Sequence, residues 1–323
     1  MGNINSTYSE SNQRPLGIGG SDIGAILGLS PYRSAVDVWL EKVGRQRSHS
    51  DAVHLRYGQH LEPFIALEYE RVTGHKTHAH PVTVRHSEHS HLFAHVDRLV
   101  SVDGEAVIDS KGEITTKTLL ECKTASAFTS TNWGAEWSDE VPPAYLAQCV
   151  WYMALTGCKE AHLAVLLGNS DFRVYRVPQD EELASVLIEQ ALRFWDEHVV
   201  KCVAPVPTNR RDVEKLYPNH LAGQEVEADT DLLSKIKRLK QLQRISKRID
   251  ERYAEATTAV TSMMREAERV CSAGKTLATW RMSAPSSRLD IARLRQEQPE
   301  IVRRYTSHGN PSRRFTLAGD RDE

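Results

Sequence analysis

The stretch TLLECKTAS, residues 118–126, places a carboxylate and an ammonium group at the end of an apolar run. Its apolar start is typical of a buried β-strand. On a strand, side chains at positions i and i+2 point to the same face, so Glu121 and Lys123 lie side by side there. Burying two charges is costly unless they are paired and serve a function. The stretch therefore predicts a core strand that carries a functional charge pair.

The composition describes an ordinary globular protein. With 323 residues, of which 40% are hydrophobic, the chain can bury one large domain and a smaller one. It has no run of 18 apolar residues, and its N-terminus lacks the apolar core of a signal peptide, so we expect a cytoplasmic protein that does not associate with a membrane. Five cysteines without a C-x-x-C pair disfavour a zinc ribbon, an iron–sulfur cluster or a disulfide framework.

Charge is distributed unevenly along the chain. Residues 1–205 hold 18 Lys and Arg against 26 Asp and Glu, whereas residues 206–323 hold 23 against 17. A net positive C-terminal part fits a polyanionic partner, and it equally fits a solvated helical surface.

The flanking segments predict an α/β (α+β) fold. A glycine-rich loop and a short helix lead through a turn at Ser30–Pro31 to a second helix ending at Gly44, and a longer helix ends at Gly74. Strand patterns follow at 81–86, 93–104 and 117–125, then a helix over 142–157, a hairpin over 161–178 and an amphipathic helix over 180–200. A central mixed sheet flanked by helices is the natural arrangement.

A helical region is predicted beyond this sheet. Proline and asparagine mark a linker around residues 204–223. Apolar residues then recur every three or four positions over 232–267, which predicts one long amphipathic helix whose apolar stripe packs in a helical hairpin or against the first domain. Two short strands, over 275–282 and 313–319, are expected around a helix at 289–305.

A second carboxylate is expected to join the charge pair. Asp97 lies in the apolar pattern of 93–104, and an antiparallel return through 117–125 brings it close to Glu121 and Lys123. Carboxylates that converge repel each other unless a cation lies between them. Oxygen ligands suit Mg²⁺ or Mn²⁺, held by Asp97, Glu121 and the backbone carbonyl of Cys122. Lys123 would then assist deprotonation of a nucleophile or neutralise developing charge.

This D-(X)n-E-X-K pattern resembles the PD-(D/E)XK nuclease superfamily, and its context resembles the YqaJ-like viral recombinases, which are relatives of the lambda-type exonuclease. The matching context, in chain order, is RPLGIGGSDIGAILGLSPYRS (14–34), GQHLEPFIALEYERVTG (58–74), VPPAYLAQCVWYMALTG (141–157) and SRRF (312–315). Two features depart from the pattern. Val96 stands where the motif has proline, and 24 positions separate Asp97 from Glu121, which we interpret as an elongated turn.

The resemblance implies a division of the chain and further site residues. It implies a flexible tail over 1–13, a restriction-endonuclease-like nuclease domain over 14–205 and a C-terminal helical extension over 206–323. Glu62 would be a third metal-site carboxylate, and Gln148 with Tyr152, which share one helix face, would order the site and its DNA contacts.

The glycine-rich opening GIGGSDIG has its own physical interpretation. No apolar strand precedes it and its spacing is wrong for a dinucleotide-binding loop. Ser21 is expected to cap a helix beginning at Asp22, leaving backbone N–H groups free to bind an anion. The resemblance implies that Arg14 and Ser21 line the pocket for the 5′-phosphate of a DNA end; taken alone, Arg14 is a solvated tail residue.

Seven histidines between residues 75 and 95 raise a zinc hypothesis. Their spacing does not support it, so exposed histidines that bind no metal are the favoured interpretation.

The resemblance implies a Mg²⁺-dependent 5′-to-3′ exonuclease that acts on linear double-stranded DNA and leaves 3′ single-stranded tails for phage-type homologous recombination in a bacterial cytoplasm. A single-strand annealing protein as partner and a homo-oligomer, a trimer in the family, are implied as well. Lys235, Lys237, Arg238 and Arg248 would contact phosphates, or would be solvent-facing flanks of the apolar stripe. Two alternatives stay open: an endonuclease of the same fold, and a non-catalytic DNA- or protein-binding scaffold.

Overall fold

The computed structural model describes residues 17–45, 53–307, 309 and 311–318. It divides into two compact units, one ending at Leu216 and one beginning at Tyr217. The first unit contains the predicted charge pair.

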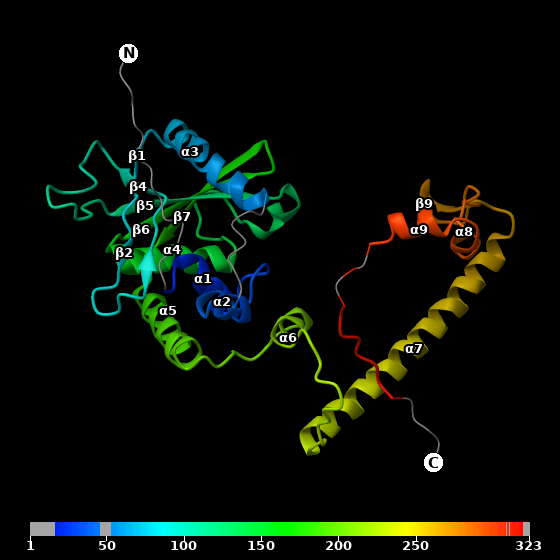
Figure 1. Cartoon of the computed structure of the whole chain (residues 1–323). Coiled ribbons are helices and arrows are strands. Elements are labelled where there is room, and N and C mark those ends of the chain that lie inside the picture. Colours follow the sequence, from blue (N-terminus) through cyan, green and yellow to red (C-terminus); the bar gives the residue numbers. More distant parts are fainter. Residues whose placement is uncertain (1–16, 46–52, 308, 310, 319–323) are drawn as a thin grey trace. The chain divides into compact units, whose positions relative to one another are not determined.

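A five-stranded mixed sheet forms the centre of the first unit, in the order β1-β4-β5-β6-β7 (Figure 1). Strands β5 and β6 run parallel, and the other neighbours are antiparallel. A separate two-stranded sheet pairs β2 with β3. The strands are β1 (Lys76–Ala79), β2 (Val84–Arg85), β3 (Phe93–Ala94), β4 (Arg98–Ser101), β5 (Thr118–Ala125), β6 (Glu160–Leu167) and β7 (Asp171–Pro178). The predicted mixed sheet flanked by helices is confirmed.

Alternation along β5 divides the core into two layers. Leu120 faces α3 and packs with Ile65 and Tyr69, whereas Leu119 faces the opposite layer with Trp151. Figure 1 shows α3 on one side of the sheet and α1, α4 and α5 on the other. The helices of this unit are α1 (Gly20–Ile26), α2 (Ala35–Lys42), α3 (Val53–Thr73), η1 (Ala127–Asn132), α4 (Pro143–Thr156), α5 (Glu181–Phe194), η2 (Trp195–Val200) and α6 (Arg210–Leu216). Glu121 and Lys123 share the α4-facing side with Leu119, as their spacing predicts.

The predicted strand over 93–104 is interrupted at Asp97. Its first part is β3, which pairs with β2, and its second part is β4, which pairs with β5. The side-chain oxygen Oδ2 of Asp97 accepts the backbone N–H of Cys122 at 2.9 Å. In a continuous β-ladder, the N–H of Cys122 would donate to a main-chain carbonyl of the neighbouring strand. Here it donates to the Asp97 carboxylate instead, and β4 begins one residue later, at Arg98.

The segment between β4 and β5 is an ordered excursion, more structured than the elongated turn expected from the sequence. Ile108 and Ile114 form an isolated antiparallel bridge. Within the turn, Asp109 Oδ1 accepts the backbone N–H groups of Lys111 and Glu113 at 2.8 and 2.9 Å. These bonds satisfy backbone donors locally, as aspartate does in tight turns.

Helix α1 begins earlier than expected, and its cap is different. The predicted cap, Ser21, is wrong: the helix starts at Gly20, its N-cap residue is Gly19, and Ser21 is an exposed residue of the first turn. The Asp22 side chain accepts the backbone N–H of Gly19 at 3.1 Å. The acidic residue at the third position therefore takes over the capping role, because a glycine cap has no side-chain acceptor.

Gly20 lets α1 approach α4 closely. A Cβ atom added to Gly20 would lie 2.4 Å from Cε1 of Tyr152. We expect Gly20→Ala to destabilise the first unit by about 1–3 kcal/mol, because the new methyl group overpacks the interface. The measurement is urea unfolding followed by tryptophan fluorescence. Gly58→Ala in α3 is the matched control, since nothing lies within 4 Å of its added Cβ; an equal loss in both variants would contradict this account.

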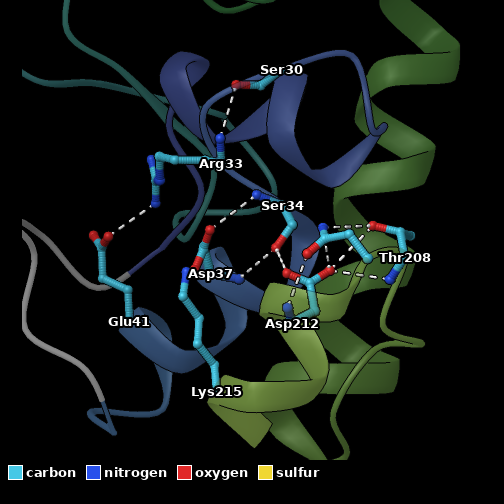
Figure 2. A network of polar contacts seen from close by, with 9 residues as sticks. Ser30, Arg33, Ser34, Asp37, Glu41, Thr208, Asp212 and Lys215 are labelled. Carbon is cyan, nitrogen blue, oxygen red and sulfur yellow. Dashed lines mark hydrogen bonds and ion pairs between the residues drawn. The ribbon is translucent and has the colours of Figure 1, made fainter. Parts of the chain in front are cut away.

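A helix forms inside the segment predicted to be a linker. Helix α6 docks on α2 through Asp212, which is 1% exposed. Its carboxylate accepts Ser34 Oγ at 2.7 Å, Thr208 N and Oγ1 at 3.1 Å each, and Asn209 Nδ2 at 3.0 Å. Lys215 pairs with Asp37 in the same network, which Figure 2 shows in close view. The sequence composition indicated a loop, but one buried carboxylate fixes this segment to the first unit.

Asp212→Ala is expected to release α6. The substitution removes the charged acceptor of the Ser34, Thr208 and Asn209 donors, and a hydrogen bond to a charged group contributes about 1.5–3 kcal/mol. Local opening should therefore become at least tenfold more frequent, and limited trypsin digestion should cut faster at Arg210 and Arg211. Glu214→Ala on the exposed side of α6 is the control, its carboxylate being 54% exposed. Unchanged cleavage of the Asp212 variant would show that the other contacts of α6, including the Lys215–Asp37 ion pair, are sufficient to hold it.

The second unit contains the long predicted helix. It consists of α7 (Thr230–Met264), β8 (Arg269–Ser272), β9 (Lys275–Thr279), α8 (Ile291–Glu297) and α9 (Pro299–Tyr305). Two expectations are wrong. Residues 313–318 form no strand, because the partner of β9 is β8, and the helix predicted over 289–305 is split at Gln298, before Pro299. In the described part of the chain, no helix combines the length and the apolarity required to cross a bilayer.

Candidate active site

The centre of the site is a buried ion pair on β5. Glu121 is 1% exposed, and its Oε1 pairs with Nζ of Lys123, whose side chain is 20% exposed. Burial lowers the pKa of Lys123, but the carboxylates of Glu121 and Asp97 outweigh burial and hold that pKa above its usual value. Lys123 is therefore a fixed positive charge that is partly exposed at the surface, while its partner Glu121 is buried.

Helix α4 supplies the second support of this pair. Gln148 Nε2 donates to Glu121 Oε1 at 2.7 Å and to Tyr152 Oη at 2.8 Å. Both side chains are 5% exposed, and they lie one helical turn apart on one face. The two predicted residues are thus brought to Glu121, where the amide orients one carboxylate oxygen and leaves the other for a further partner.

Asp97 lies beside the pair at the start of β4. Arg98 is paired with Leu120 across the β4–β5 ladder, so Asp97 comes level with Glu121. Burial, together with the Glu121 carboxylate, raises the pKa of Asp97 to about 7, although Lys123 and the Cys122 N–H oppose the shift. The predicted approach of Asp97 to Glu121 is present, with the repulsion expected of two converging carboxylates.

Glu62 reaches the site from α3 through an arginine that the sequence interpretation missed. Arg98 Nη1 donates to Glu62 Oε1 and to the backbone carbonyl of Asp97. Burial and the Asp97 carboxylate raise the pKa of Glu62 against the opposing effect of Arg98. The sequence did contain a signal for this residue: Arg98 is a charged residue inside an apolar strand pattern and directly follows Asp97, the predicted metal ligand.

The residues of this centre suit a divalent cation. Over the part of the chain that the structure describes, no three His, Cys, Asp or Glu side chains gather as a ready-made metal site. Arg98 engages Glu62, and Lys123 engages Glu121. However, Oε2 of Glu121 is buried and has no hydrogen-bond partner among the described residues. An orphaned carboxylate oxygen next to a second carboxylate of raised pKa is a fitting environment for Mg²⁺ or Mn²⁺.

The remaining predicted positions are the proposed phosphate-binding pair, Cys122 and the histidine-rich segment. Arg14 lies outside the described residues, and Ser21 is exposed on α1. Cys122 contributes its backbone N–H to Asp97. In the histidine-rich segment, His86 and His89 have ring centroids 5.1 Å apart, and His91 stacks on Trp195 at 4.8 Å.

An aromatic side chain adjoins the ammonium group, and the sequence interpretation did not assign it. Nζ of Lys123 lies 5.3 Å from the ring centroid of Tyr145, near the start of α4. The negative face of an aromatic ring attracts a cation at this range. Lys123 is therefore held between the Glu121 carboxylate and the Tyr145 ring, which fixes its direction.

Comparison with known proteins gives a family and several relatives. Residues 11–159 match the model of the YqaJ-like viral recombinase domain. The uncharacterized protein YqaJ of Bacillus subtilis (strain 168) is 29% identical over 298 residues, which cover 90% of this chain and 87% of that protein.

Two solved structures align at low similarity. An alkaline exonuclease (LHK-Exo) from Laribacter hongkongensis is 15% identical, with 62% of this chain and 95% of that chain covered and a TM-score of 0.43. A phage-related exonuclease from Haemophilus somnus 129PT is 14% identical, with 58% of this chain and 97% of that chain covered and a TM-score of 0.42.

The family match spans α1, α3, the interrupted strand at Asp97, β5 and α4, which together supply every side chain of the centre around Glu121. Residues 11–159 are therefore similar to the YqaJ-like viral recombinase domain.

Proposed function

We propose that this protein is a Mg²⁺-dependent exonuclease that degrades linear double-stranded DNA from the 5′ end and leaves 3′ single-stranded tails for homologous recombination. One observation carries the proposal: Lys123 is held beside two carboxylates, Glu121 and Asp97, one of which has a buried oxygen without a partner. The similarity of residues 11–159 to the YqaJ-like viral recombinase domain supports a nuclease role for this constellation.

The side chains of the site divide the chemical task. Asp97 and Glu121, with Glu62 and the Cys122 carbonyl, would hold the cation; a bound Mg²⁺ supplies Lewis acidity toward a phosphoryl oxygen and a more acidic water. Lys123 stabilises negative charge that develops on the phosphate, because its ammonium group is already fixed and needs no reorganisation. Gln148 keeps the Glu121 carboxylate oriented by donating to Oε1, the oxygen that Lys123 also contacts.

DNA contacts beyond the centre are part of the same proposal. Arg14 and Ser21 would receive the 5′-phosphate. Lys235, Lys237, Arg238 and Arg248 of α7 would contact backbone phosphates, and affinity would then fall as salt rises. A single-strand annealing protein is the proposed partner, and a homo-oligomer, such as a trimer around DNA, is the proposed assembly.

The test uses duplex DNA labelled at the 5′ or the 3′ terminus, in linear and closed circular form, with Mg²⁺ or with EDTA. Early release of 5′-terminal label from linear DNA alone, abolished by EDTA, is the expected result. Cleavage of the circle would instead identify an endonuclease. Absence of cleavage with both Mg²⁺ and Mn²⁺ would overturn the enzymatic proposal and favour a binding scaffold.

A further inference from the structure

A pocket opens directly beside Lys123. Its volume is about 100 Å³, and it lies where the turn after α1, the end of β5, η1 and the start of α4 meet. Its lining includes Pro31, Tyr32, Asn132, Trp133, Pro142 and Tyr145. We call this space the aromatic pocket.

Flat rings form a fixed wall of the aromatic pocket. Trp133 and Tyr145 are stacked, with ring centroids 5.6 Å apart and planes at 28°. Trp133 is 6% exposed and also packs on Tyr175, 5.3 Å away. Tyr175 Oη donates to the carbonyl of Gly134 at 3.1 Å, and Gly134 N donates to Glu140 O at 2.8 Å. The loop behind Trp133 is therefore held on both sides, and the wall is preformed.

The opposite rim is open. Tyr32 is 72% exposed although it lines the pocket. An exposed aromatic side chain in the same pocket as a buried aromatic wall leaves room for another flat body between them. Such a body would exclude water from the ring faces and gain stacking on either side.

The lining chemistry identifies what kind of body fits. The described residues around the aromatic pocket include no charged side chain, so a phosphate gains nothing there. Asn132 and Thr129 at the pocket offer neutral hydrogen-bonding groups, which can meet the edge of a heterocycle. Nucleobases stack on aromatic side chains irrespective of which base is present.

The pocket is also joined to the reacting centre. Tyr145 contributes to the pocket wall and at the same time lies 5.3 Å from Nζ of Lys123. Ala125 lines the pocket from β5, two residues after Lys123 and on the same strand face. A group in the pocket is therefore a direct neighbour of a phosphate that contacts Lys123.

We propose that the aromatic pocket binds the nucleobase adjacent to the phosphodiester bond that is cut, and thereby holds an unstacked terminal nucleotide against Lys123. This inference rests on the proposed nuclease function. It predicts cleavage that tolerates any base, because stacking on Trp133, Tyr145 and Tyr32 requires a π-face and no particular base.

The first test compares duplexes with an intact or an abasic nucleotide at each of the first two 5′ positions. We expect wild-type kcat/KM to fall about five- to a hundredfold for the abasic substrate at one of these positions. Tyr32→Ala should bring the two substrates within a few fold of each other. Tyr57 of α3 is 63% exposed and serves as the control, so Tyr57→Ala should keep the wild-type ratio of kcat/KM between the intact and the abasic substrate. Equal cleavage of both substrates by the wild type, or an unchanged ratio in Tyr32→Ala, would overturn the inference.

A second readout does not depend on cleavage. With 2-aminopurine at the sensitive position and EDTA present, binding to the wild type should quench the fluorescence through stacking, and Tyr32→Ala should quench it less. Normal cleavage without any such quenching would refute the aromatic pocket and leave the nuclease proposal intact. Quenching without cleavage of any substrate in Mg²⁺ or Mn²⁺ would refute the nuclease proposal and retain the base-binding pocket.

Discussion

Replacing Lys123 with alanine is expected to lower the rate of DNA cleavage by about 10²–10⁴-fold, the range typical of a group that moves a proton or stabilises transition-state charge. The ammonium group is fixed between Glu121 and the ring of Tyr145, so no neighbouring cation occupies the same position. The measurement is the rate of 5′-label release under single-turnover conditions, alongside circular dichroism to confirm folding.

Two further variants give this experiment its meaning. Lys123→Arg keeps the charge in a bulkier group and is expected to retain partial activity if charge stabilisation dominates. Lys159 directly precedes β6, and its side chain is 58% exposed. Lys159→Ala should therefore leave the rate of DNA cleavage unchanged. If the Lys123→Ala protein is folded and cleaves DNA at the wild-type rate, the residues around Glu121 do not catalyse the cleavage.

The largest expected loss of stability follows from Asp22→Ala, at about 3–5 kcal/mol. Asp22 is buried, and its carboxylate pairs with Lys42 at 2.8 Å and Arg33 at 3.1 Å while it caps α1 through Gly19. The Lys42 side chain is only 7% exposed, so the substitution leaves a buried ammonium group without the Asp22 carboxylate that neutralises it. Figure 2 shows Arg33 directed at Glu41, its second partner.

Urea unfolding followed by tryptophan fluorescence measures this loss, since five of the six tryptophans precede Leu216. Glu197→Ala, which removes an exposed i,i+4 pair with Arg193, should change stability by about 0.5 kcal/mol or less. Combining Asp22→Ala with Lys42→Met should recover part of the loss, because no buried charge is then left unpaired. A loss below about 1 kcal/mol for Asp22→Ala would contradict the buried-pair account.

The pH dependence of this stabilisation has a defined sign. Burial raises the pKa of Asp22, but Lys42 and Arg33 outweigh burial and hold that pKa below the ordinary 3.8. A lowered folded-state pKa gives stability that is complete above the unfolded-state value and is lost as pH falls through the folded-state value. The free-energy difference between wild type and Asp22→Ala should therefore be constant from pH 8 to about pH 5 and shrink only below about pH 4.

The sequence by itself determined the features that follow a local period. A spacing of two places Glu121 and Lys123 on one strand face, and a spacing of four places Gln148 and Tyr152 on one helix face. Both patterns persist in the structure because neighbouring residues along the chain fix them. The helix ending at Gly74 and the hairpin of β6 and β7 were predictable for the same reason.

Only the tertiary structure decided the features that join distant residues. The ladder breaks at Asp97 because its side chain takes the N–H of Cys122, 25 residues away, and α6 is held by a bond between Ser34 and Asp212, 178 residues apart. The aromatic pocket likewise requires Tyr32 and Trp133, which are distant in sequence, to line one space. No local period specifies such contacts, since each forms only when packing brings the two side chains together and burial makes their hydrogen bond or stacking favourable.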